Sequence, residues 1–198
     1  RVQIGLQHTN NEILKGINRG HTIEQGMKAI KLLKHTGFKV DIHLMPDLPF
    51  TTPELDLEMF NWVLNGDDLQ ADQWKIYPCE VTPFSQIEKW YEQKIFQPYT
   101  ERDPTLLINL LVEVKAKVHP WIRLNRVIRD IPIESIIAGN KDTNLRQLIF
   151  KKLKEKNQSC RCMRCREVRN WTEESRPILK VRKYRSSQGT EYFIAFEG

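Results

Sequence analysis

The sequence predicts an α/β fold built on a parallel sheet. Strand-like apolar runs alternate with amphipathic helical patterns up to about Lys117, which is the rhythm of parallel βαβ units. Of the 198 residues, 40% are hydrophobic and 28% are charged, a composition typical of a globular chain with a substantial core. The sequence contains no run of about 18 apolar residues, the length that a membrane-spanning helix needs. A closed (β/α)8 barrel needs about 250 residues, so we expect only part of such a barrel.

Three strands carry the predicted sheet, each a short apolar run bounded by turn residues. They are Val2–Leu6, Phe38–Leu44 and Gln73–Tyr77. The chain opens inside the first of them, without Met and without a signal-peptide pattern. We therefore expect it to be an internal piece of a longer protein.

Five helices are predicted between and after these strands: Asn10–Ile17, Thr22–Gly37, Pro53–Leu64, Pro83–Gln93 and Pro104–Lys117. In the second, Thr22 and Gln25 have the spacing of a capping box. Gly37 can take the left-handed conformation that ends a helix. Proline at the first helical position is typical of helix starts, as at Pro53.

The pattern changes after Ile122. A further helix is predicted at about Thr143–Glu155. The last part alternates over Pro177–Arg185 and Thr190–Phe196, which predicts a hairpin turning around Ser187–Gly189.

The net charge of +6 is concentrated in one segment. Residues 1–150 hold 18 Lys+Arg and 19 Asp+Glu, whereas residues 151–185 hold 13 basic and 4 acidic residues. A basic block of this kind is either a solvated face or a surface for polyanions such as nucleic acid, which release counterions when Lys and Arg bind them.

Three of the four cysteines, Cys160, Cys162 and Cys165, lie in this basic segment. Three thiolates this close in sequence can surround one soft ion and favour tetrahedral Zn²⁺. Cys79, His119 or a group outside this chain could supply a fourth ligand. The alternative is three reduced thiols in a basic loop. An iron–sulfur cluster is less favoured because it usually takes four Cys ligands, and a disulfide framework does not fit a long Lys-rich chain.

Polar residues also stand at the ends of the predicted strands. Gln7 and His8 end the first strand, His43 and Asp47 lie at the carboxyl end of the second, and Arg19 comes one short helix after the first. Ligands bind at the carboxyl edge of parallel α/β sheets, and Arg holds carboxylates bidentately. The alternative is that His43 is a satisfied interior histidine and that Asp47 caps a turn.

Arg123, Arg126 and Arg129 recur at intervals of three beside Trp121, which suits phosphate contacts and base stacking. Salt bridges to Asp130 and Glu134 are the alternative. No Ser/His/Asp set, GxSxG turn or Walker loop occurs, so hydrolase and kinase functions have no support.

Five motifs stand in a familiar order: Asn18–Thr22, His43–Pro49, Lys75–Pro78, Arg126–Pro132 and Asn144–Gln147. In this they resemble the family of the catalytic subunit of Elongator, which joins a radical SAM domain to a GNAT-type acetyltransferase domain. The resemblance covers essentially the whole chain. Tyr77–Pro83 and Cys160–Val168 are more similar to the divergent archaeal, bacterial, viral and protist members than to the yeast or animal ones.

The resemblance implies three parts. Residues 1–150 would be the C-terminal half of the radical SAM barrel and its extension, 151–176 a basic metal-binding linker, and 177–198 the start of the acetyltransferase domain. The implied reaction is carboxymethylation of the wobble uridine of tRNA at C5, with acetyl-CoA as substrate and with S-adenosylmethionine and a [4Fe–4S] cluster as radical source. The cluster motif and the acetyl-CoA pyrophosphate loop are absent from this chain, so we expect it to be inactive alone.

Residue roles follow only where a motif stands. The resemblance implies that Gln7, Arg19 and His43 line the SAM pocket, and that Cys160, Cys162 and Cys165 hold zinc. It implies a tRNA-contacting set consisting of Lys75, Tyr77, Arg123, Arg126, Arg129, Lys151, Lys152, Arg161, Arg164 and Arg166. Other Elongator subunits or a second copy would be partners, in the cytoplasm or the nucleus. The alternatives are a non-catalytic module that binds tRNA or Elongator, and a different radical SAM enzyme.

Overall fold

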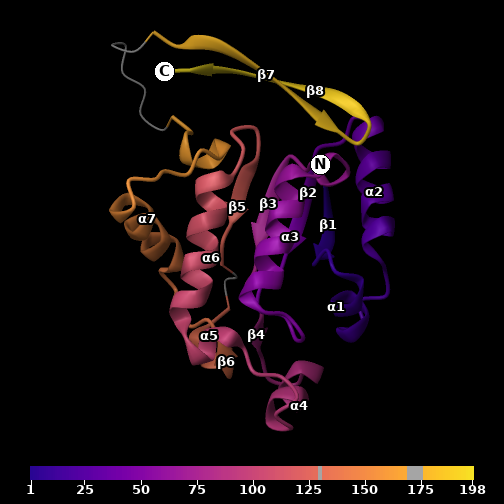
Figure 1. The fold of residues 1–198 in the computed structure, drawn as a ribbon, viewed down its shortest axis with the longest axis vertical. Helices are drawn as coiled ribbons and strands as arrows, with labels where there is room; N and C mark the ends of the chain where they lie inside the picture. The colour runs from indigo at the N-terminus through magenta and orange to yellow at the C-terminus, as the bar shows by residue number, and fades with distance from the viewer. Residues whose placement is uncertain (129–130, 169–175) are drawn as a thin grey trace.

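The structure is a computed structural model that describes residues 1–128, 131–168 and 176–198. Its main element is a four-stranded parallel sheet in the order β1-β2-β3-β5. The strands are β1 (Val2–Gln7), β2 (Val40–Leu44), β3 (Gln73–Ile76) and β5 (Arg123–Arg126). Figure 1 shows long helices in front of these strands and at both sides of them. The predicted α/β class and incomplete barrel are confirmed.

Apart from the short helix α5, which was not predicted, the helices occur near the predicted positions. They are α1 (Asn11–Gly16), α2 (Ile23–His35), α3 (Pro53–Asn65), α4 (Gln86–Glu92), α5 (Tyr99–Arg102), α6 (Pro104–Lys117) and α7 (Leu145–Glu155). Short 3-10 turns lie at η1 (Asp67–Leu69), η2 (Ile133–Ser135) and η3 (Met163–Cys165). The capping box at Thr22 and Gln25 is present. The fourth helix starts later than predicted, because the side chain of Ser85 caps it and the backbone before it is not helical.

The prediction that the alternation ends near Lys117 is wrong. Residues Arg123–Arg126 form a fourth parallel strand that pairs with β3. Only Leu124 of its four residues is buried in the core. An apolar run therefore does not reveal this strand. A small antiparallel pair, β4 (Glu80–Val81) and β6 (Ala138–Gly139), was also not predicted.

One face of the main sheet carries the core. Ile42, Leu44, Trp74, Ile76 and Leu124 are completely buried in one cluster with apolar side chains of α2, α3, α6 and α7. Strand residues alternate between the two faces of a sheet, so the residues between these point to the face opposite the core. No helix among the described residues is long and apolar enough to cross a membrane.

The predicted hairpin is present as β7 (Ile178–Ser186) and β8 (Gly189–Glu197), paired antiparallel. At its tip, Ser187 and Gln188 have φ of 49° and 67°, as a type I′ hairpin turn requires. The tip packs at the amino-terminal edge of the main sheet: Ser187 N donates to Asp67 O at 2.9 Å, and His35 Nε2 donates to Ser187 O at 2.9 Å.

An aromatic stack also joins the hairpin to the sheet. The ring of Tyr184 stacks on Trp121 with centroids 4.4 Å apart, and Trp121 stacks on His119 at 4.4 Å. Lys34 of α2 pairs with both Asp72 and Glu191, at 3.1 Å and 3.0 Å. We call the four-stranded sheet with the helices packed on it the barrel fragment. The hairpin is therefore fixed to the barrel fragment by its tip and by one side.

Candidate functional site

The face of the sheet opposite the core is polar. Asn125 of β5 donates through Nδ2 to Asp41 Oδ2 at 3.1 Å and to Gln73 Oε1 at 2.5 Å. Lys75 of β3 lies 3.9 Å from the same carboxylate, and Asp41 itself is completely buried. Sequence reasoning did not identify Asp41 and Asn125, because they sit within strands and not at strand ends. The only signal for them was a charged or amide residue at every second position.

At the carboxyl edge of β1, Arg19 folds back over the strand. Its Nε and Nη2 donate to the carbonyl of Gly5 at 3.3 Å and 2.8 Å. A Cβ at position 5 would lie 2.3 Å from Arg19 Nη2 and 2.7 Å from Gln7 Nε2. Glycine at this position therefore allows both side chains to reach the strand end.

Buried polar atoms at this edge have no hydrogen-bond partner among the described residues. They are Gln7 Oε1 and His43 Nε2. A buried polar atom without a partner is costly, so these atoms favour a polar ligand here. His21 belongs to the Asn18–Thr22 motif but was not singled out from the sequence.

The charge of Arg19 links these groups. Burial lowers the pKa of His21, and the Arg19 charge lowers it further. Burial likewise lowers the pKa of His43, followed by the charge of Lys75, which faces it on β3. Both imidazoles are therefore kept neutral beside a cation, an arrangement that suits an anionic group of a ligand. The structure brings Gln7, Arg19 and His43 to one edge, and their role in binding a cofactor stays a prediction.

Tyr77 and Lys75 lie next to this edge. The ring of Tyr77 meets His43 edge-on, with centroids 5.5 Å apart. Two members of the predicted tRNA-contacting set thus border the predicted cofactor edge, whereas the other members that the structure describes lie on β5, α7 and the cysteine loop.

Asp47, just after β2, connects this edge to the start of α5 through hydrogen bonds. Its backbone is left-handed at φ 65°, and its buried carboxylate accepts hydrogen bonds from Tyr99 N at 2.7 Å and Thr100 N at 3.2 Å. It therefore caps the start of α5, about 50 residues later in the chain, whereas the alternative interpretation expected it to cap a turn. Burial raises the pKa of Asp47 to about 7. Its own backbone N–H donates to Asp56, which lies 3.3 Å from His8, so these groups form one buried network.

Cys160, Cys162 and Cys165 converge in space. Their sulfur atoms all lie within 4.8 Å of one another, and Cys160 and Cys162 are buried. Tetrahedral Zn²⁺ with Zn–S of about 2.3 Å places sulfurs about 3.8 Å apart, so the triad fits such an ion with small adjustment. Hydrogen bonds among the three thiols raise the pKa of Cys160 and lower that of Cys162.

Neither predicted candidate for a fourth ligand joins the triad among the described residues. Cys79 packs with Ile13 and Leu48 in a separate cluster. His119 Nε2 donates to Leu64 O at 3.0 Å. The loop is held on the barrel fragment by Met163 N, which donates to Ile122 O at 2.9 Å.

The predicted basic set divides by its contacts. Arg123 pairs with Glu167 at 2.9 Å, Arg166 pairs with Glu197 at 2.6 Å, and Arg164 donates to Asn125 O at 2.7 Å. The side chains of Arg126, Lys151 and Arg161 are exposed, and Lys152 is half-buried. Arg129 lies outside the described residues, as does Asp130 of the alternative salt bridges.

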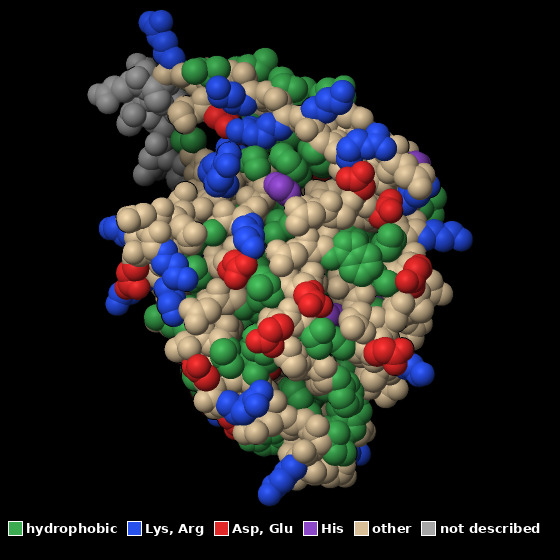
Figure 2. All heavy atoms as spheres, viewed as in Figure 1, with side chains coloured by type: hydrophobic (Ala, Val, Ile, Leu, Met, Phe, Trp, Pro, Cys, Tyr) green, Lys and Arg blue, Asp and Glu red, His purple; other side chains and the backbone are tan. Residues whose placement is uncertain are grey.

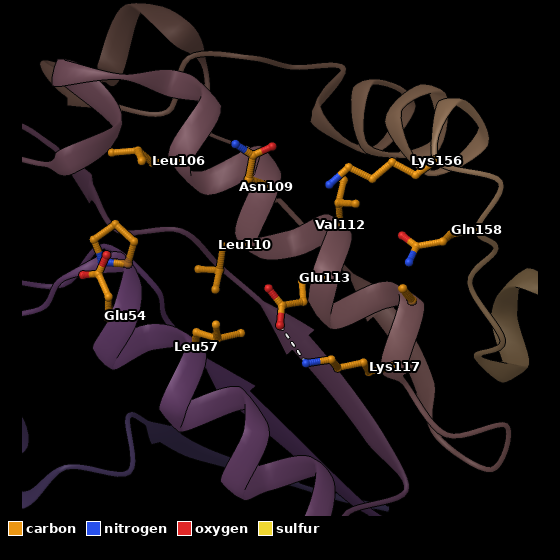
Figure 3. A pocket seen from close by; sticks show the side chains of 12 residues that line it. Glu54, Leu57, Leu106, Asn109, Leu110, Val112, Glu113, Lys117, Lys156 and Gln158 are labelled. Carbon is orange, nitrogen blue, oxygen red and sulfur yellow. Dashed lines mark hydrogen bonds and ion pairs between the residues drawn. The ribbon is translucent and has the colours of Figure 1, made fainter.

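Charged side chains of both signs lie over the helices in Figure 2, with no single-sign face on that side. A groove of about 450 Å³ lies there between α3, α6 and the end of α7 (Figure 3). Its lining mixes apolar side chains, among them Leu57, Leu110 and Val112, with charged and amide ones. Glu113 and Lys117 form an ion pair within it. It faces away from the polar side of the sheet and is not part of the candidate site.

Comparison with known proteins gives a consistent result. Residues 71–155 match the Radical_SAM C-terminal domain. The whole chain is 38% identical to tRNA uridine(34) acetyltransferase of Methanocaldococcus infernus and 36% identical to that of Dehalococcoides mccartyi, covering 38% and 43% of them. It is 34% identical to Elongator complex protein 3 of Bos taurus, covering 36% of it. It thus spans about two fifths of the curated relatives that it matches.

Among solved structures, the chain matches the archaeal Methanocaldococcus infernus Elp3 with N-terminus deletion at a TM-score of 0.92 and 37% identity. The match covers 100% of this chain and 47% of that one. The whole length of this chain is therefore homologous to a part of the sequence of tRNA uridine(34) acetyltransferases and of Elongator complex protein 3.

Proposed function

We propose that this chain is part of an enzyme that carboxymethylates the wobble uridine of tRNA at C5 by radical SAM chemistry, with acetyl-CoA as the carbon source. One observation carries the proposal: Gln7, Arg19 and His43 meet at the carboxyl edge of the sheet, with buried polar atoms of Gln7 and His43 unpartnered by described residues. The names of the relatives support the reaction assigned to that edge.

S-adenosylmethionine together with a [4Fe–4S] cluster would supply the radical when both are bound. The role of this chain is to hold the sulfonium cofactor. Arg19, already extended along β1, would bind the carboxylate of the methionine moiety with its guanidinium. Gln7 Oε1 would accept from the amino group, and the neutral imidazole of His43 would contact the ribose.

Equilibrium dialysis of labelled S-adenosylmethionine tests this assignment. Arg19→Gln should weaken binding by about tenfold or more, because a charge-assisted bond to a carboxylate is worth about 1.5–3 kcal/mol. Arg102→Gln, an exposed residue at the end of α5, is the matched control. Equal binding by wild type and Arg19→Gln would refute the role of Arg19.

The basic set is proposed to contact tRNA. Lys151 at the start of the exposed part of α7 and Arg161 in the cysteine loop point to solvent. Lys151→Ala should weaken tRNA binding at all sequences and lower the slope of log affinity against log salt by about one. Lys89→Ala on α4 removes an exposed lysine elsewhere and should leave the slope unchanged.

The triad of Cys160, Cys162 and Cys165 is proposed to hold Zn²⁺, which would fix the basic loop against β5. Metal analysis of the purified protein should find about one zinc per chain, lost in Cys162→Ser. Cys79→Ser is the control, since that thiol lies in a separate apolar cluster. Retention of zinc by Cys162→Ser would exclude this site.

The remaining parts of the proposal concern the whole protein. Its relatives named Elongator complex protein 3 suggest other Elongator subunits as partners, or a second copy of the chain, in the cytoplasm or nucleus. Co-purification of the protein from its own cells would test for such partners.

A further inference from the structure

Lys115 is a lysine in the interior of the protein. It lies near the end of α6, and its side chain is completely buried. Lys117, two residues later on the same helix, has an exposed side chain and forms an ordinary ion pair with Glu113 at 2.6 Å. A buried ammonium is costly unless an opposite charge lies beside it. The position of Lys115 therefore calls for a counter-charge.

No carboxylate forms an ion pair with Lys115 within the described ranges. Its Nζ lies 3.9 Å from Cys165 Sγ and 4.8 Å from the centroid of the Phe150 ring. Lys34, which is also nearly buried, behaves differently, because it pairs with both Asp72 and Glu191. The groups near Lys115 that can become anionic are the thiols of the cysteine triad.

A metal thiolate gives the triad the charge that matches the Lys115 ammonium. Three thiolates on one divalent cation carry a net charge of −1, which a single ammonium neutralises. Three neutral thiols would leave the Lys115 charge uncompensated in the interior. Arg146 lies near the triad too, but it is half-buried and donates through Nη2 to Leu124 O at 3.3 Å.

We propose that Lys115 is a positioning residue for the metal bound by Cys160, Cys162 and Cys165: its buried ammonium balances the metal–trithiolate charge and orients Cys165. The inference rests on the zinc site proposed above. Lys115 would act from the barrel fragment on a loop about 50 residues later in the chain, so that metal binding stabilises the contact between them.

The test uses Lys115→Met, which keeps the length of the side chain and removes its charge, with Lys117→Met as the matched control. Zinc affinity is measured on the full chain by competition with a chromophoric chelator. Lys115→Met should bind Zn²⁺ about 10- to 100-fold more weakly than wild type, the range for partners of metal ligands. Lys117→Met should bind as wild type does.

Thermal melts with and without zinc give a second readout that a purely structural role would not produce. Without metal, Lys115→Met should be at least as stable as wild type, because it removes a buried charge without a counter-charge. With metal, the gain in Tm should be smaller in the variant. The absorption of the Co²⁺-substituted protein should keep its shape, since the ligands are unchanged.

The outcomes separate the two proposals. A wild-type chain that binds no zinc would refute the metal site itself. If wild type binds zinc and Lys115→Met binds it equally well, or if metal-free Lys115→Met is unstable, the role of Lys115 is wrong while the site remains. A changed cobalt spectrum would also overturn it, because Lys115 would then be a ligand.

Discussion

Replacing Tyr184 with serine should loosen the β7–β8 hairpin from the barrel fragment without unfolding the sheet. Tyr184 is half-buried and stacks on Trp121 with ring planes 6° apart. The contacts of Ser187 with Asp67 and His35 do not involve this ring and would remain. The variant therefore tests the stack by itself.

The expected change in hairpin docking follows from the stacked geometry of Tyr184 and Trp121. A stacked aromatic pair contributes about 0.5–1.5 kcal/mol beyond the burial of its area. That energy shifts the equilibrium between docked and open hairpin by about 2- to 13-fold, and the lost burial of a half-exposed ring adds to it. The backbone amides of β7 and β8 nearest Tyr184 should exchange with solvent faster by at least this factor.

Hydrogen–deuterium exchange followed by mass spectrometry measures this directly. Tyr192→Ser is the control, because Tyr192 lies on the opposite face of the hairpin, is 60% exposed and contacts Lys183 across the strands. Equal protection of the hairpin in wild type and Tyr184→Ser would refute the reasoning. So would equal loss of protection in both variants, because the effect would then come from the hairpin itself.

Three further predictions follow from single contacts. Gly5→Ala should weaken binding of S-adenosylmethionine by about tenfold in equilibrium dialysis, because its Cβ displaces Arg19; unchanged binding would argue against the strand-end site. Since the pKa of Asp47 is raised to about 7 in the folded protein, its contribution to stability falls as pH rises from about 4 to 7, by up to about 4 kcal/mol. In urea unfolding, Asp47→Asn should therefore show a smaller fall over that window, and an equal fall would contradict this. Thr22→Ala should lower the free energy of unfolding by about 1 kcal/mol through loss of the capping box with Gln25, which thermal melts would detect.

The parts of the fold that sequence patterns predict are those whose local signals agree with their burial. The helix α2 has a capping side chain, an apolar stripe and Gly37 after its end, at φ 81°, so its limits were predicted closely. Strand β5 has one buried residue in four and polar residues on the open face of the sheet. A strand that is buried on one face and polar on the other is hard to distinguish from a loop when it is this short.

The candidate site shows the same division. Strand ends can be recognised from sequence, and they supplied Gln7 and His43. Asp41 meets Lys75 and Asn125 only because three strands lie side by side in register, a relation over 84 residues that no local pattern contains. Lys115 has the opposite problem: on a helix it looks like a solvated residue, and only the tertiary structure reveals its burial.

The cysteine loop and the hairpin tip meet the barrel fragment at the same edge of the sheet but on different elements. Met163 bonds to the chain just before β5, and Ser187 bonds to the chain just before β3. A single contact would allow a segment to rotate about it, whereas two separate contacts with the sheet restrict that rotation. The six residues of β1 span about 20 Å. The hairpin tip lies at the amino-terminal edge of the sheet and Arg19 at its carboxyl edge, so roughly this length of strand separates the two regions.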